Sequence, residues 1–349
     1  MHTGSKKRQS PAKGLDLVSG FSRLELGHLP TALEFLPNVT ESLGGPKIFV
    51  KRDDCTGLGS GGNKTRKLEF LMADAIKNGS TYVLTQGAVQ SNHVRQTAAA
   101  ACKLSLKCEL FLEHRVSSPT DDYVHSGNVY LDHLFGAKIH HLEKGSDMDD
   151  AMAGSADRLR HRGESPYVIP GGGSTPIGAL GYVACAQELL AQSQAMNMQI
   201  GHIVHATGSA GTQAGLLAGL RASGSEIPVL GVGVNADKKV QEERVFSLAC
   251  DTAALIGAKG VVSREDVVAD CNYIGGGYGI STPAMVSAVT MMARQEGLLF
   301  DPVYSGKGLA GMIDLIKKGY FEGTEYIVFI HTGGSAALFS YREAFREIG

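Results

Sequence analysis

The chain contains no tryptophan, and aromatic residues make up only 7% of its 349 residues. This scarcity argues against an aromatic stacking platform for single-stranded nucleic acid. Charge of either sign is also not in excess, because 33 Lys and Arg against 35 Asp and Glu give a net charge of −2. Such a chain has no general attraction for nucleic acid or an anionic membrane surface. We therefore expect neither as a partner.

The sequence also lacks an apolar run of about 18 residues, which a membrane-spanning helix needs. Its 6 cysteines include no C-x-x-C pair and are spread along a long chain, so neither a zinc site nor a disulfide framework is expected. These features predict free thiols, no bound metal and a cytoplasmic protein. Residues 1–16 are basic and polar without a signal-peptide core, and a disordered tail is expected there, with a short transit peptide as the alternative.

Glycine, by contrast, is abundant, with 45 residues that cluster between predicted elements. Such clusters predict tight turns and close approach of the backbone to a ligand. Short apolar runs predict strands at 48–51, 82–85, 109–113, 167–170, 203–206, 229–234 and 326–331. Between them lie predicted helices at 64–78, 90–103, 178–194, 212–222, 240–256, 283–296 and 308–317. This alternation indicates an α/β fold with parallel sheets.

Lys64 stands near the start of a predicted helix, directly after the glycine-rich segment 60–62. The positive end of the helix dipole disfavours a cation there, so the lysine is expected to lose proton affinity. A neutral amine is what Schiff-base chemistry with an aldehyde requires. The alternative is a solvated lysine that merely begins the helix.

Two further loops connect a predicted strand to a helix. In residues 86–93, Ser91, Asn92 and His93 could bind a carboxylate or phenolate, or could simply cap the helix. The loop 206–212 combines glycine with hydroxyl side chains, which is typical of a phosphate site. It lacks the spacing of an ATP or NAD motif, and a plain tight turn is the alternative.

Tyrosines and a threonine complete the candidate residues. Tyr278 lies between two glycines and Tyr304 lies in the segment 301–307, where their phenols could transfer protons or could be buried hydrogen-bonded groups. Thr332 follows a predicted strand, where α/β sheets bind ligands. A lysine amine, a phosphate loop and hydroxyls at strand ends are together the groups that pyridoxal phosphate requires.

Long segments of the chain resemble the pyridoxal-phosphate enzymes of the tryptophan-synthase-β fold. The segments are FVKRDDCTGLGSGGNKTRKLEFL, QGAVQSNHVRQTAA, PGGGSTPIGALGY, HATGSAGTQAGL, FDPVYSGKG and FIHTGGSAALF. They are similar to the group that contains 1-aminocyclopropane-1-carboxylate (ACC) deaminase, D-cysteine desulfhydrase and L-cysteate sulfo-lyase. The resemblance runs from about residue 24 to 339.

This resemblance implies a two-domain, three-layer αβα fold and a homodimer. We expect a large cofactor-binding domain at 17–55 and 162–349, a small domain at 56–161, and the cofactor between them. The resemblance implies a Schiff base at Lys64 and catalytic roles for Ser91, Tyr278 and Tyr304. It implies cofactor contacts from Lys64, Asn92, Thr207, Gly208, Ser209, Ala210, Gly211, Thr212, Ser305 and Thr332, and binding of the substrate carboxylate by Ser91, Asn92 and His93.

Ser305 departs from the deaminase pattern, which has an acidic residue after the tyrosine of DPVY. A neutral partner makes the cofactor ring a weaker electron sink, which suffices for loss of sulfide or sulfite but favours ring opening less. We therefore predict β-elimination from a cysteine-type amino acid to pyruvate and ammonia.

The substrate is less clearly indicated than the reaction. The segments favour L-cysteate, with D-cysteine as the alternative. Further alternatives are ACC deaminase, an amino-acid racemase or a non-catalytic cofactor-binding protein. A sulfonate would need extra cationic donors, and the candidates are Arg115, His125, Lys238 and Lys239.

Overall fold

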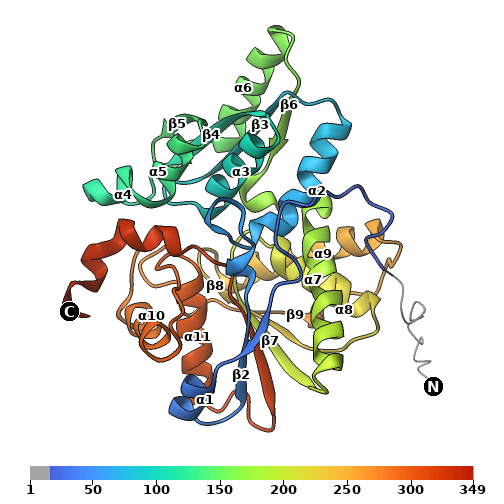
Figure 1. Cartoon of the computed structure of the whole chain (residues 1–349), viewed down its shortest axis with the longest axis vertical. Helices are drawn as coiled ribbons and strands as arrows, with labels where there is room; N and C mark the ends of the chain where they lie inside the picture. The colour runs from blue at the N-terminus through green and yellow to red at the C-terminus, as the bar shows by residue number, and fades with distance from the viewer. Residues whose placement is uncertain (1–15, 349) are drawn as a thin grey trace.

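Two β-sheets organise the computed structural model, which describes residues 16–348 (Figure 1). The larger sheet has the order β1-β2-β10-β7-β8-β9, and the smaller has the order β5-β4-β3-β6. All strand pairs are parallel except β1 with β2. The strands are β1 (Leu33–Phe35), β2 (Lys47–Lys51), β3 (Tyr82–Ala88), β4 (Lys107–Glu113), β5 (Lys138–Leu142), β6 (Pro166–Ile169), β7 (Ile200–Thr207), β8 (Val229–Gly233), β9 (Val267–Asp270) and β10 (Tyr326–Ile330).

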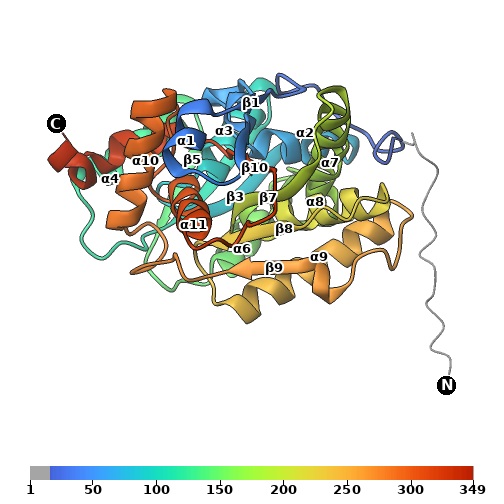
Figure 2. The same cartoon turned by 90° about the horizontal axis from the view of Figure 1, so that it is seen from below.

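Helices cover both faces of each sheet. They are α1 (Pro37–Leu43), α2 (Lys64–Lys77), α3 (Asn92–Lys103), α4 (Asp121–His125), α5 (Gly127–Leu134), α6 (Met148–His161), α7 (Pro176–Ala195), α8 (Gly211–Ala222), α9 (Lys238–Leu255), α10 (Pro283–Glu296) and α11 (Ser305–Lys317). Adjacent residues of β7 point to opposite faces, so Ile203 packs with α7, α8 and α9 while Val204 packs with α10 and α11 (Figure 2). In the smaller sheet, α6 covers one face and α2, α3 and α5 cover the other.

The predicted α/β class with parallel sheets is confirmed, and every predicted strand and helix is present with boundaries shifted by a few residues. The strands β1, β5 and β9 and the helices α1, α4, α5 and α6 were not predicted. These strands are short, and β5 carries two histidines and no fully buried side chain, so it lacks the apolar signal of a buried strand.

The smaller sheet includes β6, which follows residue 161, where the sequence analysis ends the small domain. The other three strands of this sheet lie within the predicted range 56–161. The division into two domains stays a prediction. The predicted tail lies outside the described residues except for Asp16.

A buried ion network joins the start of α2 to β2 of the larger sheet and to α7, which packs on that sheet. Arg66 donates to both oxygens of Asp53, at 2.8 and 2.9 Å, and also reaches Glu188 on α7 at 2.9 Å. Lys51 on β2 contacts the same Glu188, and Tyr182 on α7 donates to Asp53 at 2.7 Å. Since Arg66 is two residues from Lys64, this network anchors the turn that carries the predicted cofactor lysine.

Within residues 16–348, no helix is long and apolar enough to cross a membrane. The same part of the chain contains no group of three or more His, Cys, Asp or Glu side chains arranged to hold a metal ion.

Candidate active site

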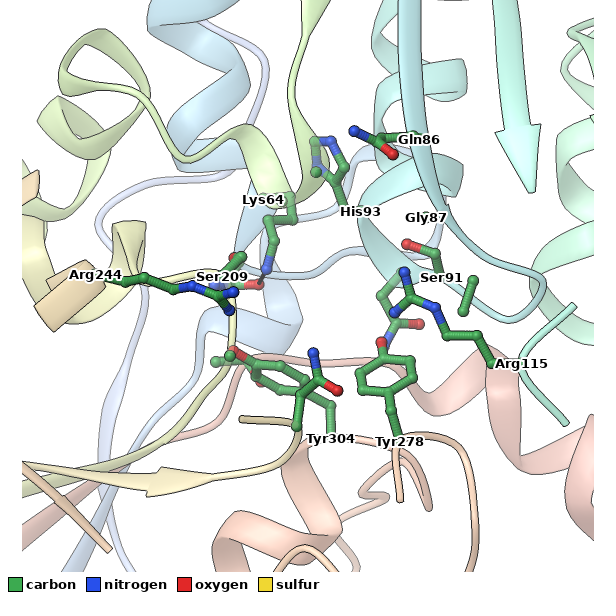
Figure 3. A pocket seen from close by; sticks show the side chains of 18 residues that line it. Lys64, Gln86, Gly87, Ser91, His93, Arg115, Ser209, Arg244, Tyr278 and Tyr304 are labelled. Atoms are coloured by element: carbon green, nitrogen blue, oxygen red, sulfur yellow. Dashed lines mark hydrogen bonds between the residues drawn. The ribbon is translucent and has the colours of Figure 1, made fainter. Parts of the chain in front are cut away.

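A cavity of about 210 Å³ lies beyond the carboxyl ends of strands from both sheets. A water molecule occupies about 30 Å³ in the liquid, so the cavity is much larger than a packing defect. Its lining includes most of the predicted site residues: Lys64, Ser91, Asn92, His93, Gly208, Ser209, Tyr278, Tyr304 and Thr332. Segments far apart in the sequence therefore converge on one space (Figure 3).

Lys64 is the first residue of α2, and its amine points into the cavity (Figure 3). The side chain is buried, and its Nζ donates to Asn63 Oδ1 at 3.1 Å. Burial lowers the pKa of Lys64 to about 8, although the nearby Asp301 partly opposes the shift. The expected loss of proton affinity is present, but burial is its main cause. An amine of this kind is available as a nucleophile toward an aldehyde near neutral pH.

The predicted phosphate loop connects β7 to α8. Ala210 has a φ of +68°, which is rare for a residue with a side chain and marks a constrained turn. A Cβ on Gly211 would lie 2.7 Å from Lys67 Nζ and 2.9 Å from Ser174 Oγ, so a larger residue there would have to displace these two side chains. The geometry leaves a concave turn at the start of a helix, which favours an anion.

Only part of this loop lines the cavity directly. Gly208 and Ser209 do, whereas Thr207, Ala210, Gly211 and Thr212 lie behind them. Two of those hydroxyls bind protein groups, since Thr207 accepts from Gln241 at 2.9 Å and Thr212 accepts from Asn63 at 3.2 Å. Their expected role is therefore to shape the loop, with contacts to a ligand through its backbone.

The start of α3 forms the opposite wall. Ser91 is the N-cap, and its hydroxyl accepts from the backbone N–H of Val94 at 3.3 Å. The N–H groups of Asn92 and His93 begin the helix and have no partner within it, so they are free to bind an anion. The Asn92 side chain accepts from Asn128 at 2.9 Å, which leaves its own amide N–H group as the donor.

His93 is neutral and its orientation is set by Thr85. Thr85 donates to the Ile169 carbonyl at 2.9 Å, so it accepts from His93 Nε2, also at 2.9 Å. Burial, together with Lys64 and Lys67, holds the pKa of His93 well below its usual value. Its Nδ1 has no hydrogen-bond partner among the described residues. The backbone of His93, and not its ring, is therefore suited to hold a carboxylate.

The two predicted tyrosines enter from the larger layer. The ring of Tyr304, the residue before α11, lies 5.6 Å from Lys64 Nζ. Tyr278 lies on the loop between β9 and α10, where Lys307 donates to the carbonyls of Ile274 and Gly277 at 2.6 and 2.7 Å. Burial raises the pKa values of both tyrosines above their usual value, so both phenols stay protonated.

Ser305, predicted to bind the cofactor, does not line the cavity. Its hydroxyl lies 2.5 Å from Asp301 Oδ2 and 3.1 Å from the Gly333 carbonyl oxygen. Asp301 also accepts from the backbone N–H groups of Val303, Tyr304 and Ser305. This buried carboxylate, which binds the Ser305 hydroxyl, was not predicted from the sequence. Thr332 does reach the cavity, at the end of β10.

Of the four cationic candidates for a sulfonate, only Arg115 lines the cavity. His125 faces Asp121 at 3.5 Å and Lys238 faces Glu242 at 3.6 Å, both away from this space, and Lys239 is exposed on α9. Arg115 itself donates to Glu113 at 2.5 Å.

Two basic side chains near the cavity were not predicted as site residues. Burial, together with the neighbouring Lys64, holds the pKa of Lys67 well below its usual value. Lys67 is buried next to the phosphate loop, and its Nζ donates only to the Gly172 carbonyl, at 3.0 Å, within the described chain. Arg244 reaches the cavity from α9 beside Ser209 (Figure 3). Lys67 could have been predicted from the sequence, because it follows Lys64 by one helical turn. No sequence signal points to Arg244, because only folding brings it near the loop.

Comparison with known proteins agrees with this geometry. The family described as "Pyridoxal-phosphate dependent enzyme" matches residues 24–333. The chain belongs to this family. It is 44% identical to a protein named D-cysteine desulfhydrase from Salmonella choleraesuis (strain SC-B67), over 93% of this chain and 97% of that one. The counterpart from Salmonella paratyphi C is 43% identical over the same shares.

Solved structures also resemble this pyridoxal-phosphate enzyme. A structure titled as an ACC deaminase homologue has a TM-score of 0.85 at 37% identity, covering 95% of this chain and 98% of that one. A structure of the T.th. threonine deaminase has a TM-score of 0.65 at 18% identity, covering 93% and 98%, which supports the fold alone. The predicted fold and cofactor are thereby confirmed.

The residues present fit pyridoxal phosphate. A buried amine of lowered pKa faces the cavity, a glycine-lined turn with the Lys67 amine beside it suits a phosphate, and the Asn92 amide supplies a further donor. Lys64 would hold the aldehyde, and the turn at Gly208 and Ser209 with Lys67 would hold the phosphate. The individual roles of these residues stay predictions.

Proposed function

We propose that this enzyme catalyses β-elimination from D-cysteine. The reaction breaks the α-carbon–hydrogen bond and the β-carbon–sulfur bond, and water replaces the nitrogen. D-cysteine and one water thus give pyruvate, ammonia and hydrogen sulfide, with no oxidant or reductant. The relatives at 42–44% identity that carry the name D-cysteine desulfhydrase support this reaction.

The sequence-based preference for L-cysteate is not supported by the comparisons, which favour the alternative. The placement of the four predicted sulfonate donors also argues against a sulfonate at that end of the cavity. Of the four predicted sulfonate donors, three lie elsewhere, and the fourth, Arg115, is paired with Glu113. The similarity to proteins named D-cysteine desulfhydrase is the observation that carries the proposal. At Arg115 a second anionic group on the substrate would meet a cation already paired with a carboxylate, and Arg244, the other arginine at the cavity, lies beside Ser209 of the predicted phosphate turn.

The protein groups can each be given a task in this reaction. The backbone N–H groups at the start of α3, with the Ser91 hydroxyl, bind and orient the substrate carboxylate. Lys64, with its pKa lowered to about 8, takes up and releases a proton near neutral pH, which suits removal of the α-hydrogen. Tyr278 and Tyr304 stay protonated because burial raises their pKa values, so each can donate a hydrogen bond to the departing sulfide.

Pyridoxal phosphate, when bound, supplies an aldehyde for the amino group and a ring that withdraws electrons from the α-carbon. The surrounding walls limit water around the reacting atoms, since Lys64, Ser91 and His93 are each less than 10% exposed. Burial also strengthens the interactions of these polar groups with the substrate.

The test is a product assay on purified, cofactor-loaded protein. D-cysteine, L-cysteine, L-cysteate and ACC are supplied separately, and pyruvate, sulfide, sulfite and 2-oxobutyrate are quantified. Sulfide and pyruvate in equal amounts from D-cysteine are expected. Sulfite from L-cysteate as the main product, with little reaction of D-cysteine, would overturn the proposal in favour of a sulfo-lyase.

The homodimer implied by the resemblance and the cytoplasmic location inferred from the cysteines stay predictions. Light scattering on the holoenzyme measures the first directly, with a mass near twice the 36.8 kDa of the chain expected.

A further inference from the structure

A pair of opposite charges, Glu113 and Arg115, stands at the edge of the cavity. Glu113 ends β4, and Arg115 follows two residues later. Arg115 Nε donates to one carboxylate oxygen of Glu113 at 2.5 Å, and the backbone N–H of Gly145 donates to the other at 3.0 Å. Both Glu113 oxygens are thus occupied, which fixes the carboxylate and, through it, the guanidinium.

The rest of the guanidinium is free to meet a ligand. Arginine has five N–H donors, of which the structure of residues 16–348 uses the one on Nε. The guanidinium carbon lies 5.4 Å from the centre of the Tyr278 ring. In Figure 3 the group reaches into the cavity between Ser91 and Tyr278, where the substrate carboxylate is expected. Its two terminal nitrogens therefore face the substrate side.

We propose that Arg115 binds the substrate carboxylate through its terminal nitrogens, while Glu113 balances its charge and thereby excludes amino acids with an anionic β-substituent. The pair acts as a charge filter for the substrate. This inference rests on the proposed function for its substrate class.

The pair can distinguish ligands by charge because its two charged groups lie in direct contact. Burial alone would raise the pKa of Glu113, but the N–H of Gly145 and the Arg115 guanidinium outweigh it and hold the pKa below its usual value. The pair therefore carries one negative and one positive charge at neutral pH. A substrate carboxylate still receives hydrogen bonds from the guanidinium, but a second anionic group finds little net positive charge there.

The alternative is that the pair only ties the end of β4 to the loop at Gly145. A purely structural role would change the affinities of all ligands together. A charge filter would change the ratio of the dissociation constants of two ligands that differ by one charge. Removal of Glu113 and removal of Arg115 would change this ratio in opposite directions. The ratio is therefore the quantity to measure.

The experiment uses holoenzyme and two pairs of ligands without a good leaving group, D-alanine with D-aspartate and L-alanine with L-aspartate. Aspartate adds an anionic β-substituent, as cysteate does. Dissociation constants are obtained from the change in the cofactor's visible absorption on ligand addition, so the result is independent of sulfide production. The variants are Glu113→Gln, Arg115→Met and the double variant, and the control is Glu143→Gln, which removes an exposed carboxylate without an ion pair among the described residues.

In Glu113→Gln we expect the ratio of the aspartate to the alanine dissociation constant to fall about tenfold, since an unpaired guanidinium attracts the second carboxylate. In Arg115→Met we expect it to rise by a similar factor, with alanine itself binding about tenfold more weakly. The double variant should return the ratio close to its initial value, and Glu143→Gln should leave it unchanged.

An unchanged ratio in Glu113→Gln, with thermal stability retained, would overturn the filter. An equal fall in Glu143→Gln would also overturn it, because the effect would then be one of net charge. If Glu113→Gln fails to fold, Arg115→Met alone tests the proposal. Equal weakening of alanine and aspartate binding in that variant would contradict it. Absence of sulfide from D-cysteine would refute the proposed function and leave the ratio measurable.

Discussion

The amine of Lys64 lies 5.6 Å from the centre of the Tyr304 ring, and both groups face the same cavity. This contact joins α2, which packs on the smaller sheet, to the segment before α11, which packs on the larger sheet. The reaction is expected to take place at this point. We predict that Lys64→Ala abolishes sulfide release from D-cysteine, because within residues 16–348 no other lysine lines the cavity. The control is Lys77→Ala, at the exposed end of the same helix, which should keep full activity. Normal turnover by Lys64→Ala would refute the assignment.

Tyr304→Phe should lower turnover by about 10²-fold or more while the cofactor stays bound, since the phenol is proposed to donate a hydrogen bond to the departing sulfide. Turnover and the cofactor's absorption are measured on the same sample. Tyr320→Phe, at a half-exposed ring, is the matched control. Loss of cofactor with unchanged turnover per bound cofactor would show that Tyr304 holds the cofactor instead.

Cofactor uptake by the apoenzyme should become faster as the pH rises through about 8. Burial lowers the pKa of Lys64 to about 8, so the neutral amine is the minor form below that pH and the major form above it. At pH 7 about a tenth of the amines would be neutral, against less than about 0.1% for an ordinary lysine. Uptake is followed by absorption at several pH values. A rate that keeps rising steeply beyond pH 9 would contradict the lowered pKa.

Gly211→Ala should weaken cofactor binding, because the added Cβ would come within 2.7 Å of Lys67 Nζ and 2.9 Å of Ser174 Oγ and would push both side chains away from their places beside the loop. The control, Gly154→Ala within α6, meets only Arg158 at 3.5 Å and should be neutral or slightly stabilising. Equilibrium dialysis of the cofactor tests both variants. Wild-type affinity in Gly211→Ala would remove this loop from the phosphate site.

Arg66→Met should lower the free energy of unfolding by about 3–5 kcal/mol, because it leaves the buried Asp53 without its guanidinium partner and removes one of the two cations that pair with Glu188. Arg264→Met breaks an exposed pair with Glu243 and should cost about 0–1 kcal/mol. Denaturant unfolding of both variants gives the comparison. Equal small losses would mean that the buried network adds little to the stability of the site.

Much of this protein could be predicted from its sequence. Strands buried on both faces, such as β7 and β8, are short continuous apolar runs, and loops between a strand and a helix must contain the glycines that allow sharp turns. These local signals, with long motif resemblance, identified the fold class and the cofactor, and they led to the prediction for Lys64. Strands with mixed exposure such as β5 carry no such signal, and the sequence analysis missed them.

The charges around the site depended on the tertiary structure. Asp301 precedes Ser305 by four residues in a segment that the sequence analysis examined, yet only the fold shows that the two side chains bind each other inside the protein. Arg115 and His125 are similar cationic candidates by sequence, but only Arg115 reaches the cavity.

The sequence by itself therefore determined the parallel α/β architecture, the cofactor class and the lysine at the start of α2, because local patterning and turn chemistry encode them. The tertiary structure decided which of the four cationic candidates lines the cavity, and that Glu113 pairs with it. Electrostatic selection depends on distances between residues far apart in the chain, such as Arg115 and Tyr278 at 5.4 Å, and these distances exist only after folding.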